Sequence, residues 1–502
     1  RRRTKPSMSR VQLLRLDLDA PPSSRWNAIV PAYREQLRRV VNELYSTFGD
    51  AALEAGGASP NDDGDARAFA QQLAMALRDQ LESLGFREGF DDIVAIARLA
   101  NLPIEDIALL HLAYESVDDA VAGRAAGCTT LVAASSASSG NDDAPLLART
   151  LDWDIPGMRE LCVDFSVWRG GVEIAKATSF VGYAGILTAL RLPTAAAAAQ
   201  SSGFGFAINY RATPPPLAAA ALASHAADLG DAPAEDGSEA RLGAATPAFP
   251  IGFLARFALQ TCATFTEAVA VFRTEALWAP CYVILVGARP AEHVVLARSE
   301  RSVDDACAVG GAAAAAAAAA AGSGSDATTL VLVQANADHG DVAALESERL
   351  VAIGSAETFE AKRERWMREV GGVVAGEGEA SDDDDDAAAE ADTMEVVRAI
   401  VAESATRVRA AEWLWGLSGA PSASDALPAA RLRCILENAS ISDESTIHGT
   451  ILAVAPLRYE SWIHRCGTTG AQSAPGDRCD KENDGASAAP ASVGPQRRCA
   501  CS

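Results

Sequence analysis

The N-terminal quarter of the chain carries apolar residues at helical spacing. After Pro31, which suits the first turn of a helix, apolar side chains recur every three or four positions as far as Phe48, and Gly49 is predicted to end this helix. The same spacing returns in three further segments, 66–86, 91–100 and 104–114. We therefore expect residues 1–127 to form a helical N-terminal segment.

From Cys128 onward the pattern changes to that of β-strands. Runs of apolar or alternating residues predict strands over nine segments: 128–133, 146–153, 161–167, 172–180, 185–190, 204–210, 281–287, 293–297 and 329–334. A helical block over 251–274 interrupts them, and the capping-box pattern Thr264-Phe-Thr-Glu267 predicts that a second helix begins inside it. Because strands and helices do not alternate regularly, we expect an α+β fold with largely antiparallel sheet.

Segments of low complexity interrupt this pattern. Five of them, rich in Ala, Gly, Ser, Pro or Asp, are expected to be inserted surface loops: 134–143, 194–203, 212–247, 303–327 and 375–392. Residues 467–502 have the same character and are expected to form a disordered tail. Without these parts the 502 residues leave one catalytic unit over 128–466, and not the three domains that length alone favours.

The charge of the chain is strongly acidic and unevenly distributed. The formal net charge is −24, and ten acidic residues with no basic one lie between Glu377 and Glu395. A charge of this sign argues against a general nucleic-acid binder. No run of about twenty apolar residues predicts a membrane-spanning helix. No signal peptide is visible in the sequence.

Cysteine and histidine give no sign of a metal site. The ten cysteines contain no Cys-x-x-Cys pair, and the six histidines show no ligand spacing. The sequence also lacks a phosphate-binding loop and a dinucleotide-binding fingerprint. We therefore expect a protein that uses no metal and no cofactor. A catalytic Cys–His pair finds little support in the spacing.

Cys128 follows a stretch of mostly small residues, 122–127, where the helical pattern gives way to strands. A thiol in this position can attack the preceding carbonyl, and hydrolysis of the resulting thioester leaves the cysteine as a new N-terminus. The freed α-amine, with a pKa of about 8, then serves as the base of the thiol. The alternative is a buried cysteine that acts only as a small apolar residue.

The next predicted strand carries Arg149 and Asp152 among apolar residues. A charged residue in a strand that faces a core must be paired or functional. The two residues therefore either belong to a catalytic site or form a structural ion pair.

Several motifs, in order along the chain, resemble those of one enzyme family. They are Leu16-Asp-Leu-Asp-Ala-Pro-Pro22 with Arg25-Trp26, Leu112-Ala-Tyr-Glu-Ser116, Cys128-Thr-Thr-Leu-Val-Ala133, Arg149-Thr-Leu-Asp152, the glycine-containing block from Thr178 to Thr188, and Gln334-Ala-Asn-Ala-Asp338. From about Val11 to Cys466 the chain resembles the acid ceramidases and N-acylethanolamine-hydrolysing acid amidases, which are N-terminal-nucleophile hydrolases related to bile-salt hydrolases. The resemblance implies a four-layer αββα sandwich that follows the helical N-terminal segment.

The resemblance also implies roles for residues on the first two of these strands. Cys128 matches the nucleophile that frees its own amine. Arg149 and Asp152 match the residues that orient the amine and the thiol and stabilise their charges.

Three further residues match more distant parts of the family site. Asn336 and, more weakly, Asn209 match asparagines on the oxyanion side, and Arg349 matches a distal active-site arginine. The chain departs from the family beside two of them. Tyr210 stands where acid ceramidases have glutamate, and Ala337 stands where the family has tyrosine.

The function that the resemblance implies is cleavage of the amide bond of an N-acyl lipid, either ceramide or an N-acylethanolamine, through a thioester at Cys128. Self-cleavage before this residue would give an α-subunit, 1–127, and a β-subunit, 128–466, that remain partners. Two alternatives are an acyltransferase that uses the same thioester and a non-catalytic lipid-binding protein. The resemblance further implies peripheral contact with membrane lipid, no nucleic-acid partner, and a lysosomal or other acidic lumenal or secreted compartment.

Overall fold

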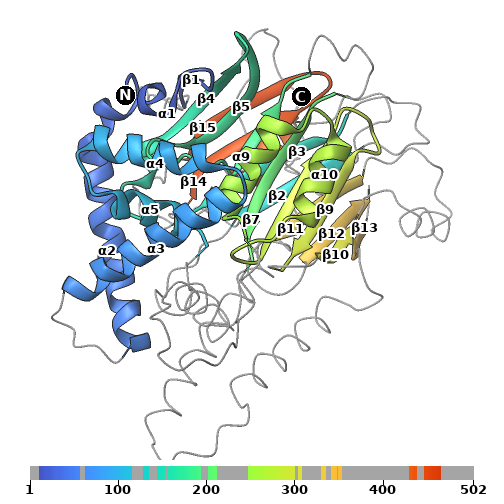
Figure 1. Ribbon diagram of the computed structural model, residues 1–502. Helices are drawn as coiled ribbons and strands as arrows, with labels where there is room; N and C mark the ends of the chain where they lie inside the picture. Colours follow the sequence, from blue (N-terminus) through green and yellow to red (C-terminus); the bar gives the residue numbers. More distant parts are fainter. Residues whose placement is uncertain are drawn as a thin grey trace, which may run out of the picture.

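Two β-sheets lie face to face, with helices outside them and a group of helices formed by the N-terminal part of the chain (Figure 1). The structure is a computed structural model. It describes residues 11–56, 63–115, 128–134, 144–153, 155–193, 202–211, 247–299, 303–307, 329–334, 341–346, 349–352, 429–437 and 446–464. The acidic segment around residues 377–395, most of the predicted insertions and the predicted tail lie outside the described residues.

The N-terminal helices agree with the helical spacing, although some ends differ. They are α1 (Pro22–Arg25), η1 (Val30–Tyr33), α2 (Arg34–Gly56), α3 (Asp63–Ser83), α4 (Arg87–Ala100) and α5 (Ile104–Leu112). The predicted helix end at Gly49 is wrong, because α2 continues to Gly56. A glycine inside a helix costs only about 1 kcal/mol relative to alanine, which packing of the helix readily outweighs.

The segment before these helices is a strand. β1 (Gln12–Asp17) pairs in parallel with β4 (Cys162–Arg169). The prediction that all of residues 1–127 are helical is therefore wrong at this point. From Leu14 to Asp17 apolar and charged residues alternate, which is the period of a strand with one buried face.

Within the described residues, the larger sheet has eight strands in the order β1-β4-β5-β6-β7-β8-β9-β10. Beyond β1 and β4 they are β5 (Val172–Phe180), β6 (Thr188–Arg191), β7 (Phe204–Tyr210), β8 (Cys281–Val286), β9 (His293–Arg298) and β10 (Val303–Cys307). Every neighbouring pair after β1 and β4 is antiparallel, as predicted. The predicted insertion over 303–327 is wrong in its first five residues, since these form β10.

In the part of the chain that the structure describes, the smaller sheet has seven antiparallel strands in the order β13-β12-β11-β2-β3-β14-β15. They are β2 (Cys128–Ala134), β3 (Leu146–Asp152), β11 (Thr329–Gln334), β12 (Asp341–Glu346), β13 (Arg349–Ala352), β14 (Thr446–Ala453) and β15 (Arg458–Ile463). β2 is the central strand of this order. Every residue of β2 and β3 is buried, as expected for strands that are covered on both faces.

Helices cover the outer face of each sheet. On the smaller sheet, α14 (Ala429–Leu436) contacts β3 and β14, and Leu432 and Ile435 join Leu131 in an apolar cluster of their own. On the larger sheet, α10 (Phe265–Thr274) contacts β7 and β8 and packs on α9 (Ile251–Thr261). The four layers are therefore helix, sheet, sheet and helix, which confirms the predicted αββα sandwich.

The break between α9 and α10 is a confirmed prediction. Thr264 precedes α10, and its side chain accepts from the backbone N–H of Glu267. The carboxylate of Glu267 accepts in return from the backbone N–H of Thr264. This reciprocal capping box satisfies two donors that a helix start would otherwise leave unpaired.

The inner faces of the sheets share one core with the N-terminal helices. β2 and β3 both contact β7, and the largest cluster of buried apolar residues includes side chains from both sheets and from α2 to α5. Gly182, just after β5, shows how close the approach is. Its φ is 95°, and a Cβ atom there would overlap with Leu37 of α2. No helix within the described ranges is long and apolar enough to span a bilayer.

Candidate active site

Cys128 is the first residue of the central strand β2. It pairs with Leu151 of β3, and its side chain is 1% exposed within the core between the two sheets. A buried strand that begins at this cysteine is what the sequence predicts. Residues 116–127, which contain the expected cleavage site, lie outside the described residues.

Arg149 places a buried cation directly beside this thiol. Its Nη2 atom donates to Cys128 Sγ at 3.0 Å, while its Nη1 atom donates to the Leu187 carbonyl at 3.0 Å and to Thr188 Oγ1 at 2.7 Å. The whole side chain is inaccessible to solvent. Burial of an unpaired guanidinium is expensive, so these hydrogen bonds are needed to hold it there. A neighbouring cation stabilises the thiolate, which is the nucleophilic form of cysteine.

Asp152 lies at the end of the same strand as Arg149 and has a different partner. Its Oδ1 atom accepts from Thr446 Oγ1 of β14 at 2.6 Å. None of the three hydrogen bonds of Arg149 goes to Asp152. Within the described residues, Arg149 is therefore held by the thiol, by Thr188 of β6 and by Leu187 just before it, and none of its hydrogen bonds pairs it with Asp152. The role of Asp152 toward a freed amine stays a prediction.

Asn209 approaches the nucleophile strand from the larger sheet. It lies on β7, and its Oδ1 atom accepts from Thr130 Oγ1 at 2.8 Å. Asn209 is fully buried, and its Nδ2 atom has no hydrogen-bond partner among the described residues. An unpaired buried donor is uncommon in folded proteins and is suited to receive an oxyanion.

The other two predicted residues are located only in part. Asn336 lies outside the described residues, but Gln334, two positions before it, pairs with Thr129 beside the nucleophile. Arg349 begins β13, the edge strand, and β12 and β11 separate it from β2. The roles of both residues stay predictions.

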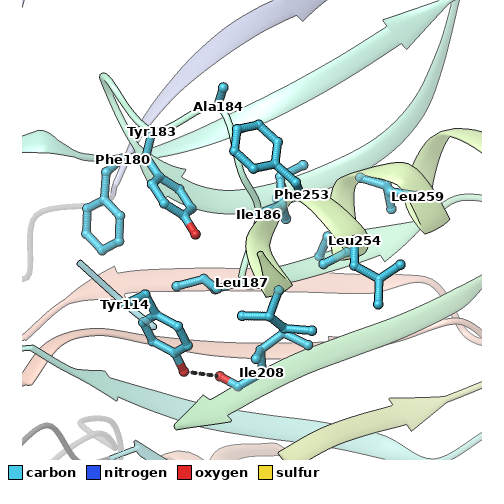
Figure 2. Close-up of a cluster of buried hydrophobic side chains, with 14 of the residues drawn as sticks. Tyr114, Phe180, Tyr183, Ala184, Ile186, Leu187, Ile208, Phe253, Leu254 and Leu259 are labelled. Carbon is cyan, nitrogen blue, oxygen red and sulfur yellow. Dashed lines mark hydrogen bonds between the residues drawn. The ribbon is translucent and has the colours of Figure 1, made fainter. Parts of the chain in front are cut away.

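Aromatic residues that we did not select from the sequence as functional line the same region. The Tyr114 hydroxyl donates to the Ile208 carbonyl at 3.1 Å (Figure 2), and its ring packs edge-on against Trp153 with centroids 5.7 Å apart. Burial, together with the nearby Cys128, raises the pKa of Tyr114 well above its usual value. Tyr114 is therefore a neutral packing residue. Trp153 presents a buried indole N–H without a partner in the described part of the chain.

His448 is the histidine that lies nearest in register to the nucleophile. It pairs with Leu151 on β14, so it shares a row of the smaller sheet with Cys128. Burial lowers the pKa of His448 to about 3, with the charge of Arg149 contributing, and the ring is therefore neutral. Its Nδ1 atom lies 3.2 Å from Thr450 Oγ1. β14 was not predicted, although its β-branched residues are typical of a strand.

Metal ligands do not gather in the ranges that the structure describes. No group of three or more His, Cys, Asp and Glu side chains there is arranged to hold a metal ion. The chemistry available at the site is that of a thiol, a guanidinium and an amide.

Comparison with known proteins bears on the family resemblance. A family model described as the beta subunit of N-acylethanolamine-hydrolyzing acid amidase matches residues 9–54. An N-acylethanolamine-hydrolyzing acid amidase of Caenorhabditis elegans is 23% identical over 289 residues, which are 57% of this chain and 67% of that protein. An uncharacterised protein of Acanthamoeba polyphaga mimivirus is 19% identical over 314 residues, which are 59% of this chain and 76% of that protein.

One solved structure, that of a Caenorhabditis elegans N-acylethanolamine-hydrolyzing acid amidase ortholog, aligns with a TM-score of 0.39 at 16% identity and covers 67% of this chain and 100% of that one. The sequence matches confirm the resemblance to the acid ceramidase and acid amidase family. The matched residues lie in the N-terminal fragment, 1–127, which was expected to be the α-subunit, although the family model is described as a beta subunit.

Proposed function

We propose that this chain, which is similar to N-acylethanolamine-hydrolyzing acid amidases, is a cysteine amidohydrolase that acts on N-acyl lipids. The observation that carries the proposal is the 3.0 Å hydrogen bond from Arg149 Nη2 to Cys128 Sγ inside a dry core. A cysteine that only fills space needs no cation beside it. A buried guanidinium aimed at sulfur is explained when the sulfur bears negative charge during a reaction.

The first step of the proposed mechanism frees the amine of Cys128. Its Sγ atom attacks the carbonyl carbon of Gly127, the carbon–nitrogen bond to Cys128 breaks, and the acyl group moves to sulfur while the nitrogen takes up the thiol proton. Water then hydrolyses the thioester, which leaves a carboxyl group on Gly127 and a free α-amine on Cys128. This amine has an intrinsic pKa of about 8 and serves as the base in later turnovers.

In turnover the thiol attacks the amide carbonyl of the lipid and gives its proton to the α-amine. The oxygen becomes an oxyanion, for which Asn209 Nδ2 is the unpaired buried donor. One such donor is typically worth about 2.7–4 kcal/mol in the transition state. The amine returns the proton to the leaving head-group nitrogen, and water releases the fatty acid from the thioester.

The substrate is proposed to be ceramide or an N-acylethanolamine, since both present an acyl amide next to a hydroxyl-bearing head group. The relative with 23% identity is named for the second of these. We further propose that the enzyme acts in an acidic lumenal compartment, such as the lysosome, because that relative is named an acid amidase.

The test compares the wild-type chain with Cys128→Ala after incubation at acid pH. Intact mass and N-terminal sequencing report cleavage, and hydrolysis of ceramide and N-acylethanolamine is measured side by side. We expect wild type to gain an N-terminus at residue 128 and to release fatty acid, and Cys128→Ala to do neither. Cys281→Ala is the matched control, because Cys281 also opens a buried strand and burial raises its pKa to about 12.

Other outcomes decide between the alternatives. Normal cleavage before residue 128 in Cys128→Ala would exclude self-processing. An acyl product formed on an added amine or alcohol, in place of free fatty acid, would favour the acyltransferase. Tight lipid binding by wild type without any turnover would favour the non-catalytic lipid-binding protein.

A further inference from the structure

A hydrogen bond between the two sheets fixes the orientation of the Asn209 amide. Thr130 lies two residues after Cys128 on β2, so both side chains point to the same face of the strand. The Thr130 hydroxyl reaches across to β7 and donates to Asn209 Oδ1 at 2.8 Å. Both residues are 0% exposed, so water does not compete for this contact.

This contact decides which end of the amide is left unpaired. Because the amide oxygen accepts from Thr130, the Nδ2 group points elsewhere and has no partner among the described residues. An unmet buried N–H destabilises the folded state, and a ligand oxygen that accepts from it would relieve this cost. With the amide turned around, Nδ2 would donate to Thr130 and the carbonyl oxygen would take its place. An oxyanion would then be repelled by the side chain that should bind it.

We propose that Thr130 is a positioning residue that keeps the Asn209 amide turned so that its N–H donates to the oxyanion of the amide substrate. This inference rests on the proposed function and deepens it. Thr130 itself touches neither the substrate nor the thiol in this scheme. It acts through Asn209 alone, so its removal should affect the transition state and leave binding of the neutral substrate largely intact.

Thr129 offers a matched control on the same strand. It is also 0% exposed, but it points to the opposite face of β2, and its hydroxyl has no hydrogen-bond partner within the described residues. Thr129→Val and Thr130→Val therefore make the same chemical change at adjacent buried positions. Only the second change removes a hydrogen bond to Asn209.

The experiment measures kcat and KM for an N-acylethanolamine with wild type, Thr130→Val, Thr130→Ser, Asn209→Ala and the control Thr129→Val. We expect Thr130→Val to lower kcat about 10-fold to 10²-fold with KM changed less than threefold, on the scale of a weakened oxyanion donor. Thr130→Ser keeps the hydroxyl and should recover most of the rate. Thr129→Val should behave like wild type.

Two further measurements separate positioning from a structural role. In the Asn209→Ala background Thr130→Val should cause no additional loss, because its effect passes through the amide. A fatty aldehyde should inhibit Thr130→Val about 10-fold less well. Its carbonyl carbon bonds to Cys128 Sγ, the thiol proton passes to the α-amine, and the carbonyl oxygen is left as an oxyanion at the Asn209 position. Inhibition by a fatty alcohol of the same chain length, which has no carbonyl carbon to bond to sulfur and places no anionic oxygen there, should stay the same. Each comparison uses the folded, processed fraction of the variant.

The possible failures are distinguishable. If wild type hydrolyses no N-acyl amide, the proposed function fails before any variant is compared. If wild type is active and Thr130→Val keeps its kcat, or loses as much rate in the Asn209→Ala background as in wild type, the positioning role is wrong. If Thr130→Val does not fold, the decision passes to Thr130→Ser. Aldehyde inhibition as weak in Thr130→Ser as in Asn209→Ala would then refute a role for the hydroxyl.

Discussion

The Arg149 guanidinium lies 3.0 Å from the Cys128 sulfur and is held there by two acceptors on the opposite sheet, the Leu187 carbonyl and the Thr188 hydroxyl. One side chain thus connects the nucleophile on β2 to the strand β6. The thiol environment depends on how the two sheets pack and not on β2 and β3 alone. A substitution of Arg149 therefore removes charge and cross-sheet contacts together.

The first prediction concerns this guanidinium. Arg149→Met should lower kcat/KM for an N-acylethanolamine by about 10²-fold or more, since the thiolate and the developing charge lose their buried cation. Arg149→Lys should recover little, because an ammonium lacks the planar fork that reaches three acceptors. Steady-state kinetics measure both. Arg169→Met, at the exposed last residue of β4, is the control, and an Arg149→Met rate within threefold of wild type would contradict the prediction.

A second prediction concerns a buried carboxylate that joins the N-terminal helices to α9. Asp92 Oδ2 accepts from Arg25 Nη1 at 3.2 Å and from Arg256 Nη2 at 2.5 Å, and its Oδ1 accepts from Trp26 Nε1 at 2.8 Å. Asp92→Asn leaves the two buried guanidinium groups with only the more distant, partly exposed carboxylate of Glu88, which lies 3.4 Å from Arg25 Nη1 and 3.5 Å from Arg256 Nη2. The expected loss of unfolding free energy is about 3–5 kcal/mol, as for removal of one partner from a buried ion pair.

Urea denaturation followed by tryptophan fluorescence measures this loss. Asp91→Asn, on the same helix but half exposed, is the matched control and should change the unfolding free energy by less than about 0.5 kcal/mol. Equal effects of the two substitutions would show that the buried contacts of Asp92 do not add to the free energy of unfolding. Since Arg256 lies after Cys128 and Asp92 before it, the network would also hold the two fragments together after cleavage.

Local patterns were sufficient for the elements that carry the site. β7 and β11 have the predicted bounds, and Cys128 opens β2 as expected, because continuous apolar runs bounded by polar residues are typical of buried strands. The strands that were not predicted lie where the surrounding sequence pattern did not indicate a strand. β1 was hidden by the helical spacing that follows it, and β14 lies in a C-terminal region where no strand was predicted.

The contacts that define the site could not be read from local pattern. Thr130 and Asn209 are 79 residues apart, and Arg149 and Thr188 are 39 apart. Each pair meets only because two sheets pack face to face, which depends on the whole core. The partner of Asp152 was equally hidden, since it lies on the unpredicted strand β14. The family resemblance supplied the residues, and the fold supplied their contacts.

The third prediction is a loss of stability on acidification that comes from His111. The Ala184 N–H donates to His111 Nε2 at 2.7 Å, so the ring proton sits on Nδ1, which faces the Ile107 carbonyl at 2.7 Å. Burial lowers the pKa of His111 to about 4 from 6.5. The unfolded chain therefore takes up the proton first. The contribution of the neutral His111 ring to the free energy of unfolding is complete above pH 6.5 and is lost as the pH falls toward 4.

The expected loss is about 3 kcal/mol across this window, at about 1.4 kcal/mol for each unit of pKa difference. His111→Phe should remove this loss, so that the unfolding free energy of the variant gains about 3 kcal/mol on that of wild type as the pH falls from 6.5 to 4. It should also lower stability at pH 8, because the Ala184 N–H loses its acceptor. Urea unfolding at a series of pH values separates the pH-independent loss, which comes from the Ala184 N–H, from the change of unfolding free energy with pH. An unchanged slope in His111→Phe would refute the assignment.

The fourth prediction is a loss of stability as the pH rises, which is the opposite of the effect of His111. It comes from Glu115, the last described residue before the segment that leads to Cys128. Its Oε1 atom accepts from the Ile251 N–H at the start of α9 at 2.8 Å, while Oε2 is buried without a partner in the described part of the chain. Burial raises the pKa of Glu115 to about 8 from 4.5, although backbone hydrogen bonds oppose the shift. The folded carboxyl therefore stays protonated at neutral pH.

Its contribution to stability is complete below pH 4.5 and is lost as the pH rises through 8, which amounts to about 3 kcal/mol between pH 4.5 and 7. Glu115→Gln keeps the acceptor and cannot ionise, so its unfolding free energy should exceed that of wild type by a margin that grows over this range. Glu35→Gln, at an exposed position on α2, should keep the wild-type slope. A constant difference between Glu115→Gln and wild type would exclude the proton linkage. Glu115 makes the free energy of unfolding larger at acid pH, and His111 makes it smaller. The free energy of unfolding of wild type should therefore pass through a maximum on the acid side of neutrality. The two substitutions should shift that maximum in opposite directions.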